Sequence, residues 1–277
     1  MRRLNKSLMF SAMSLVLGAS PVWAGEPMTT TTSPVQVTIT VTGTDHHPMP
    51  ELTRQDLMVF QNNQQRPVVD LQPVIASPGG LDLAILIDGS LVSSLSLQFP
   101  DIRRFVASLP ASAAVGVAYA EYGRARFTQD FTADRAKAEN ALSIPEGRVN
   151  AGASIFQSVT DLVKHWPADG HARSVLLVSN GVDINRGVSE TIPTLNPDLN
   201  EAVLEAQRAG VVVYTIYAGG AAWFSHQWFL LTNGQSMLSW IAEQTGGESY
   251  FEGNETPVSL SPFLKRSSAR RSVVSTY

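Results

Sequence analysis

Residues 81–90 read LDLAILIDGS, a largely apolar stretch, with one acid at Asp82, that ends in polar residues at Asp88 and Ser90. A continuous apolar run, rather than an alternating one, is typical of a strand in a parallel sheet whose two faces are both covered by helices. Further runs of this kind lie at residues 113–119, 174–178 and 211–217, with a shorter one at 248–251. These stretches predict the strands of one buried sheet.

Helical patterns lie between the predicted strands. Apolar residues recur at spacings of three and four over residues 102–109 and 155–163. Residues 199–208 and 237–245 are each followed by glycine in the position of a helix C-cap. Strands that alternate with helices predict an α/β fold: a doubly wound, mostly parallel, Rossmann-like sheet.

The predicted sheet is preceded and followed by segments of other character. Residues 1–24 have the basic start, apolar run and small final residues of a secretory signal peptide. Residues 25–34 are small and polar, as in a flexible leader, and the alternation that starts at residue 35 predicts a small antiparallel β unit over 35–75. Residues 265–277 carry four cations and no acid, and we expect a basic, disordered tail.

Composition and charge exclude several classes of function. The 277 residues are 44% hydrophobic, 16% charged and free of cysteine, which excludes disulfides, Cys-ligated zinc and a thiol nucleophile. Without residues 1–24, the chain has 17 Lys and Arg and 24 Asp and Glu, which gives a net charge of −7. Nucleic acid is therefore excluded as a partner. No second apolar run of spanning length follows, so we expect a periplasmic or secreted protein without a transmembrane span.

Oxygen-bearing side chains follow the ends of the predicted strands. Asp88 and Ser90 follow the first strand, Ser154 opens the helix at residue 155, and Asn180 and Asp183 follow the strand at 174–178. In a doubly wound sheet, ligands bind beyond the carboxyl ends of the strands, where the strand order reverses. Such a donor set suits a hard cation such as Mg²⁺.

These loops resemble the metal-ion-dependent adhesion site of von Willebrand factor type A domains, which reads Asp-x-Ser-x-Ser, then Thr, then Asp. The segments LTRQDLMVFQNNQQ, EAQRAGVVVYTIY and IAEQTGGESYF resemble, more narrowly, the von Willebrand-related proteins common in Acidobacteria. The resemblance covers residues 35–263, with the type A domain at 81–263. It implies a non-enzymatic adhesion or scaffold module in which a bound metal is completed by an acidic residue of a protein partner. Relatives continue beyond residue 264, so we expect the tail here to be truncated or altered.

The adhesion motif is degenerate in this chain. Val92 stands in place of the second serine, Ser154 in place of the threonine, and Asn180 in place of the last aspartate. Mg²⁺ demands near-ideal octahedral geometry, so the loss of one ligand and one charge weakens its binding. Two interpretations stay open: a weak Mg²⁺ site, or no metal, with Asp88 and Ser90 capping the first helix and Asn180-Gly181 forming a turn. We favour the second.

Other catalytic motifs are missing from the sequence. It has no Gly-x-Ser-x-Gly elbow, phosphate loop or Gly-x-Gly-x-x-Gly, and none of its five histidines forms a His-x-x-x-His pair. An envelope hydrolase or phosphotransfer enzyme that uses Asp88 is the alternative to a binding module. A structural scaffold subunit is a third possibility.

An aromatic segment lies at residues 219–235, which we predict to be a loop beyond the strand at 211–217. It carries Trp223, Phe224, Trp228 and Phe229. Aromatic side chains at the same edge as Asp183 would anchor a protein partner. The alternative is that the segment folds down and packs against the β unit or the last helix.

Overall fold

The computed structural model describes residues 34–39, 52–73, 80–89, 91, 99–143, 153–218, 228–250 and 271–276. The predicted signal peptide and nearly all of the predicted leader lie outside the described residues, as do Ser90, Val92, Trp223 and Phe224. No helix in the described part of the chain is long and apolar enough to cross a membrane.

The larger sheet has six strands in the order β10-β9-β8-β5-β6-β7. All neighbouring pairs are parallel except β6 and β7, so the predicted doubly wound, mostly parallel sheet is confirmed. The strands are β5 (Leu81–Asp88), β6 (Ala113–Glu121), β7 (Arg124–Thr132), β8 (Ala172–Ser179), β9 (Val211–Tyr217) and β10 (Ser249–Tyr250).

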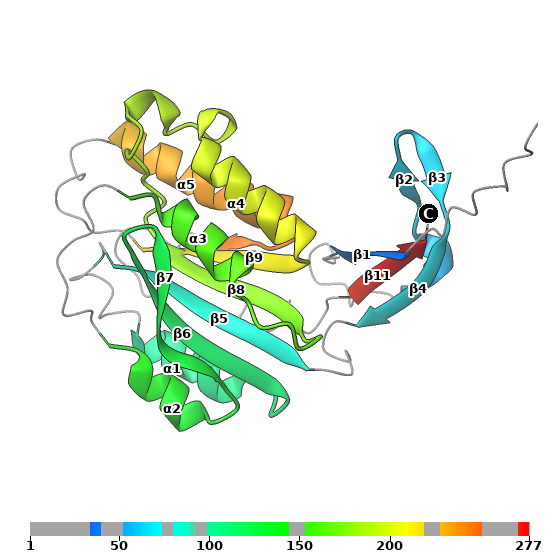
Figure 1. The fold of residues 1–277 in the computed structure, drawn as a ribbon, viewed down its shortest axis with the longest axis horizontal. Coiled ribbons are helices and arrows are strands. Elements are labelled where there is room, and N and C mark those ends of the chain that lie inside the picture. Colours follow the sequence, from blue (N-terminus) through cyan, green and yellow to red (C-terminus); the bar gives the residue numbers. More distant parts are fainter. Residues whose placement is uncertain are drawn as a thin grey trace, which may run out of the picture. The chain divides into compact units, whose positions relative to one another are not determined.

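Helices cover both faces of this sheet (Figure 1). Alternate residues of β5 point to opposite sides: Leu83, Ile85 and Ile87 belong to one core with α1 (Phe99–Ser108) and α2 (Arg135–Ala141). Ala84 and Leu86 belong to a second core with α3 (Ile155–Lys164), α4 (Pro197–Arg208) and α5 (Trp228–Gln244). Burial on both faces explains why Leu83 to Ile87 are apolar without alternation.

Strand β7 and helix α2 were not predicted from the sequence. β7 is an edge strand with exposed and half-buried residues in alternation, so it lacks the continuous apolar run of its neighbours. It is joined to β6 by a tight turn in which Tyr122 and Gly123 both have positive φ. A two-residue turn of this kind matches the right-handed twist of an antiparallel pair.

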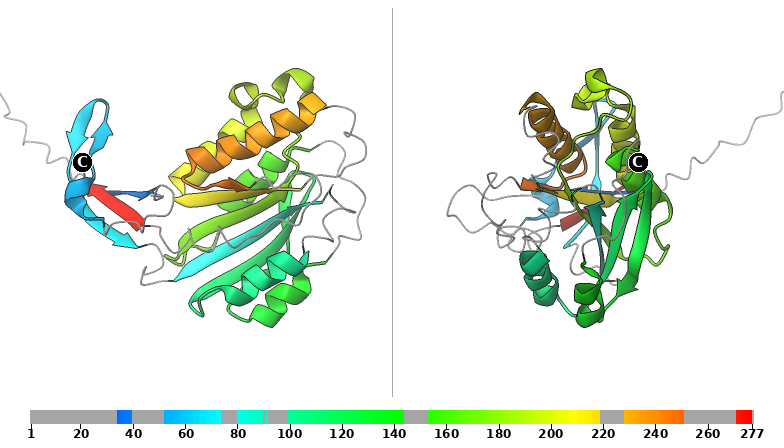
Figure 2. Two further views of the ribbon diagram at one scale, coloured as in Figure 1. Left: turned by 180° about the vertical axis from the view of Figure 1, so that it is seen from behind. Right: turned by 90° about the vertical axis from the view of Figure 1, so that its left-hand side faces the viewer.

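The predicted loop at residues 219–235 is wrong over its second half, because α5 begins at Trp228 (Figure 2). The first two turns of this helix are rich in apolar residues on several sides and show little three-to-four periodicity. Helical periodicity is the signal on which such a prediction depends, and it is weak here.

A second, antiparallel sheet has the order β1-β11-β4, with β1 (Pro34–Ile39), β4 (Val68–Pro73) and β11 (Arg271–Thr276). The prediction of a disordered tail over 265–277 is therefore wrong for residues 271–276. The segment RSVVST contains three β-branched residues, which favour extended backbone, and its backbone pairs on both sides. Charge alone was a poor guide to its structure.

Short elements complete the described chain. β2 (Val59–Gln61) and β3 (Gln64–Arg66) form a hairpin whose turn residues, Asn62 and Asn63, have φ of 51° and 61°. Two left-handed turn residues define the hairpin turn that asparagine tolerates well. The three short 3₁₀ helices are η1 (Arg54–Asp56), η4 (Val188–Glu190) and η5 (Pro193–Leu195).

We predict that two leucines of helix α4 differ sharply in their effect on stability. Leu199 is 0% exposed in the second core, whereas Leu204 on the same helix is 49% exposed. Leu199→Ala should lower the free energy of unfolding by about 2–5 kcal/mol through the cavity it leaves. Leu204→Ala should change it by no more than about 0.5 kcal/mol. Urea unfolding of both variants measures the difference, and equal losses would contradict the assigned helix face.

Candidate functional site

The strand order reverses between β5 and β8, because the chain leaves β5 for β6 on one side and later returns to β8 on the other. The carboxyl ends of these two strands border the crevice where doubly wound sheets bind ligands. Asp88 ends β5 and Ser179 ends β8, and the Ser179 hydroxyl donates a hydrogen bond of 2.7 Å to the Asp88 carboxylate. We call Asp88, Ser154, Ser179, Asn180 and Asp183 the carboxyl-edge site.

Asp183 joins two helix N-termini within this site. Ser154 is the N-cap of α3, where its Oγ accepts from the backbone N–H of Phe156, and it donates to Asp183 Oδ2 at 2.5 Å. Asn196 is the N-cap of α4, where it accepts from the backbone of Leu199, and its Nδ2 donates to the same Asp183 oxygen at 3.1 Å. The buried carboxylate of Asp183 therefore fixes the starts of α3 and α4 relative to each other.

The Asn180 side chain is buried in a turn. Its Oδ1 accepts from the backbone N–H of Val182 at 2.8 Å, and Gly181 has φ of +68°. A Cβ on Gly181 would lie 2.2 Å from the carbonyl oxygen of Gly234 in α5, so the two backbones touch where no side chain fits. The loop after β8 is thus fixed directly on helix α5.

The interpretation without metal has Asp88 capping the first helix, and it stays a prediction. The described part of α1 starts at Phe99, and residues 92–98, which precede it, lie outside the described residues. Asp88 is bonded to Ser179 across the two strand ends. Ser90, the second predicted cap, lies outside the described residues.

The buried carboxylate of Asp198 forms an ion pair with the half-exposed Arg186, which the sequence did not suggest. Arg186 donates to both of its carboxylate oxygens at 3.0 Å, and Gln157 of α3 donates at 3.2 Å. Burial acts to raise the pKa of Asp198, but the bonds from Arg186 and Gln157 outweigh it and hold that pKa below its usual 3.8. The signature Asn-Pro-Asp at 196–198 marks a helix start and could have pointed to this acid.

Exposed apolar side chains lie on the loop after β8 and at the start of α5. Asn233 of α5 donates to Thr191 of the loop at 2.9 Å, which ties these two segments together. We call the exposed set the apolar rim; its members are 39% to 75% exposed and comprise Ile184, Val188, Ile192, Leu195, Trp228 and Phe229. Large apolar side chains grouped at a surface indicate an interaction site.

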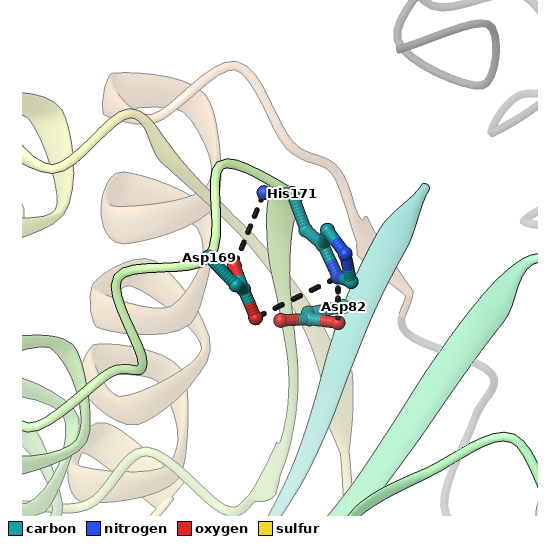
Figure 3. A group of neighbouring side chains, drawn as sticks. All are labelled: Asp82, Asp169 and His171. Atoms are coloured by element: carbon teal, nitrogen blue, oxygen red, sulfur yellow. Dashed lines mark hydrogen bonds and ion pairs between the residues drawn. The ribbon is translucent and has the colours of Figure 1, made fainter. Parts of the chain in front are cut away.

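A second group of chemically active side chains lies at the opposite edge of the sheet, where the parallel strands begin (Figure 3). Asp82 near the start of β5 accepts from His171 Nδ1 at 2.8 Å and from Trp166 Nε1 at 3.4 Å. Asp169 Oδ2 lies 3.6 Å from the same His171 nitrogen. We call Asp82, Asp169 and His171 the amino-edge cluster, a set whose donor atoms lie within 4.8 Å of one another.

The three side chains of the amino-edge cluster shift one another's pKa values. The hydrogen bond to Asp82 raises the pKa of His171. Burial raises the pKa of Asp82, which is 1% exposed, although the His171 bond opposes this. For Asp169 the burial effect is outweighed by hydrogen bonds from His171 and Asp82, and its pKa is lowered. In the sequence, Asp82 could have indicated this cluster, because an acid inside an apolar strand is rare unless it has a partner.

Among the comparisons with known proteins, no family model and no curated protein matches the chain. Many solved structures match in part, and three of them are described. An aerotolerance-related membrane protein from Bacteroides fragilis, with multiple mutations to serines, covers 69% of this chain and 98% of its own, with a TM-score of 0.51 and 16% identity. The match to BatB from Bacteroides thetaiotaomicron covers 68% of this chain and 96% of BatB, with a TM-score of 0.46 and 16% identity. The match to the VWA domain of SpRpn10 covers 66% of this chain and 93% of that domain, with a TM-score of 0.42 and 13% identity.

The similarity to the Bacteroides fragilis protein extends to the fold and no further, because the identity is low. With the observed strand order and the helices on both faces, it confirms the predicted doubly wound, Rossmann-like α/β fold of the larger domain, which is the fold expected of a von Willebrand factor type A domain. The narrower relation to Acidobacterial proteins stays a prediction from sequence motifs.

We predict that Ser154→Ala destabilises the protein by about 2 kcal/mol, because it removes both the cap of α3 and a donor to the buried Asp183. Ser154→Thr keeps the hydroxyl and should retain most of that stability. Ser189→Ala, at an exposed position of η4, is the matched control and should have little effect. Chemical unfolding distinguishes these variants, and a neutral Ser154→Ala would contradict the assigned role.

We also predict that the Arg186 and Asp198 pair contributes stability that depends on pH. Because the pKa of Asp198 is lowered in the folded protein, its contribution is present above 3.8 and is lost as the pH falls through the folded value. Asp198→Asn should therefore be less stable than the wild type at neutral pH, and the difference should shrink below pH 3.8. Melting curves over this range measure it, with Glu201→Gln of the exposed Lys164 pair as the control.

Proposed function

We propose that this chain is an exported, non-enzymatic module that binds a protein partner through the apolar rim. The observation that carries the proposal is a group of exposed apolar and aromatic side chains on a rigid support. The loop that bears four of them is held by Asp183 at its start and by Asn196 at its end. A surface fixed before binding loses little conformational entropy when a partner docks, and exposed aromatic residues are effective anchors.

The residues of the carboxyl-edge site fit Mg²⁺ poorly. Asn180 Oδ1 already accepts a backbone hydrogen bond in its own turn, and the hydroxyls of Ser154 and Ser179 donate to the two carboxylates of the site. A six-coordinate ion would have to break several of these bonds. We therefore assign these residues to shaping the rim rather than to holding a metal that the partner completes.

An enzyme that uses Asp88 has less support. The carboxylate is buried and accepts the Ser179 hydroxyl, whereas a phosphoryl acceptor or a general acid must reach a substrate. We place the module in the periplasm or outside the cell, because of the signal-like residues 1–24. The similar Bacteroides fragilis structure is described as a membrane protein, which agrees with a site of action at the cell envelope.

The proposal predicts that shortening two side chains of the apolar rim abolishes partner capture. Leu195→Ala/Trp228→Ala should reduce the amount of partner captured from the native envelope at least roughly tenfold, because buried aromatic anchors dominate interfaces. Leu204→Ala removes an exposed leucine away from the rim and is the matched control. Captured proteins are identified by mass spectrometry, and melting temperatures verify that the variants fold.

Addition of EDTA and the variant Asp88→Ala test the metal-free mechanism in the same assay. Capture should survive both. Capture that is lost with EDTA and with Asp88→Ala would show a metal-dependent site and overturn that part of the proposal. Turnover in a broad hydrolase screen that disappears in Asp88→Ala would replace the binding function by an enzymatic one.

A further inference from the structure

The amino-edge cluster brings together three side chains that are far apart in the sequence. β5 and β8 run parallel with Asp82 opposite Arg173, and His171, two residues before Arg173, directly precedes β8, so its ring reaches Asp82 diagonally across the two strands. Asp169 lies two residues earlier in the same loop. Figure 3 shows the two carboxylates and the imidazole turned toward one another. This group lies at the edge of the sheet opposite to the carboxyl-edge site and has no part in the proposed function.

Each carboxylate has one oxygen held by the protein and one directed at the centre of the cluster. Trp166 Nε1 donates to Asp82 Oδ2, and the backbone N–H of His171 donates to Asp169 Oδ1 at 3.1 Å. The remaining oxygens, Asp82 Oδ1 and Asp169 Oδ2, lie 2.8 Å and 3.6 Å from His171 Nδ1. Outer hydrogen bonds of this kind orient the ligands in protein metal sites.

The separations match those of ligands around one small ion. Zinc binds imidazole nitrogen and carboxylate oxygen at about 2.1 Å, so in tetrahedral geometry two ligands lie about 3.4 Å apart. The observed separations fall on either side of this value, and small side-chain movements would admit an ion. It would take the place of the proton that His171 Nδ1 shares with the carboxylates.

We propose that Asp82, Asp169 and His171 bind a borderline divalent transition-metal ion such as Zn²⁺. A mixed set of imidazole and carboxylate ligands favours such an ion over Mg²⁺, which prefers oxygen ligands alone. Asp169 and His171 are partly exposed, with 35% and 30% of their side-chain surface open, so the ion has an entry path. Three protein ligands leave a fourth position for water.

Titration of the full chain with Zn²⁺ tests this site, with calorimetry and melting temperature as readouts. We expect one ion per chain at this cluster and a rise in melting temperature, because an ion bound only by the folded state stabilises it. Asp169→Asn should weaken binding about 10–100-fold while leaving the bond between His171 and Asp82 in place. His171→Gln should abolish binding, and Mg²⁺ at equal concentration should not compete.

Matched controls separate this site from other histidines. His165 pairs with Asp161 at 3.3 Å, and the described residues offer no third ligand beside them, so His165→Gln should leave zinc binding unchanged. His46→Gln/His47→Gln removes the adjacent pair of histidines in the sequence and should also leave it unchanged. No heat and no shift in melting temperature would overturn the proposal, as would binding that survives both cluster variants or that depends on His46 and His47.

Discussion

The carboxylate of Asp183 is the interaction on which the carboxyl edge of the sheet depends. Ser154 and Asn196, the N-caps of α3 and α4, both donate to one of its oxygens, and so two helix starts share one buried charge. A carboxylate near helix N-termini is also favoured by the helix dipoles. The loop between Asp183 and Asn196 begins and ends at this point, and it carries four of the six residues of the apolar rim.

The described part of the larger domain could be predicted well where burial alone decides the structure. β9 matches its predicted bounds, because both faces of VVVYTIY are covered and every residue is buried. β7 was not predicted because an edge strand is apolar on one side only. The predicted start of α5 lies too far along the chain because the first turns of the helix lack a clear three-to-four periodicity of apolar residues. β11 was missed because its partners lie more than 190 residues away in the chain, a separation taken from its pairing with β4.

For the sites, the sequence located residues but not their partners. Asp88, Ser154, Asn180 and Asp183 follow predicted strands or open helices, and strand ends are where such folds place chemistry. The bonds that Ser179 and Asn196 make to these acids depend on three-dimensional packing, and no local pattern indicates them. The amino-edge cluster depends on the register of β5 against β8, which a single sequence does not specify.

The central position of β11 between β1 and β4 gives the chain an unusual closure. Strands from both sides of the α/β domain in sequence are hydrogen-bonded in one small sheet, so residues 40–270 form a loop fastened at its base. A protease that cuts once within this loop produces two fragments that the sheet still joins. A single nick would then leave the two halves associated instead of releasing them.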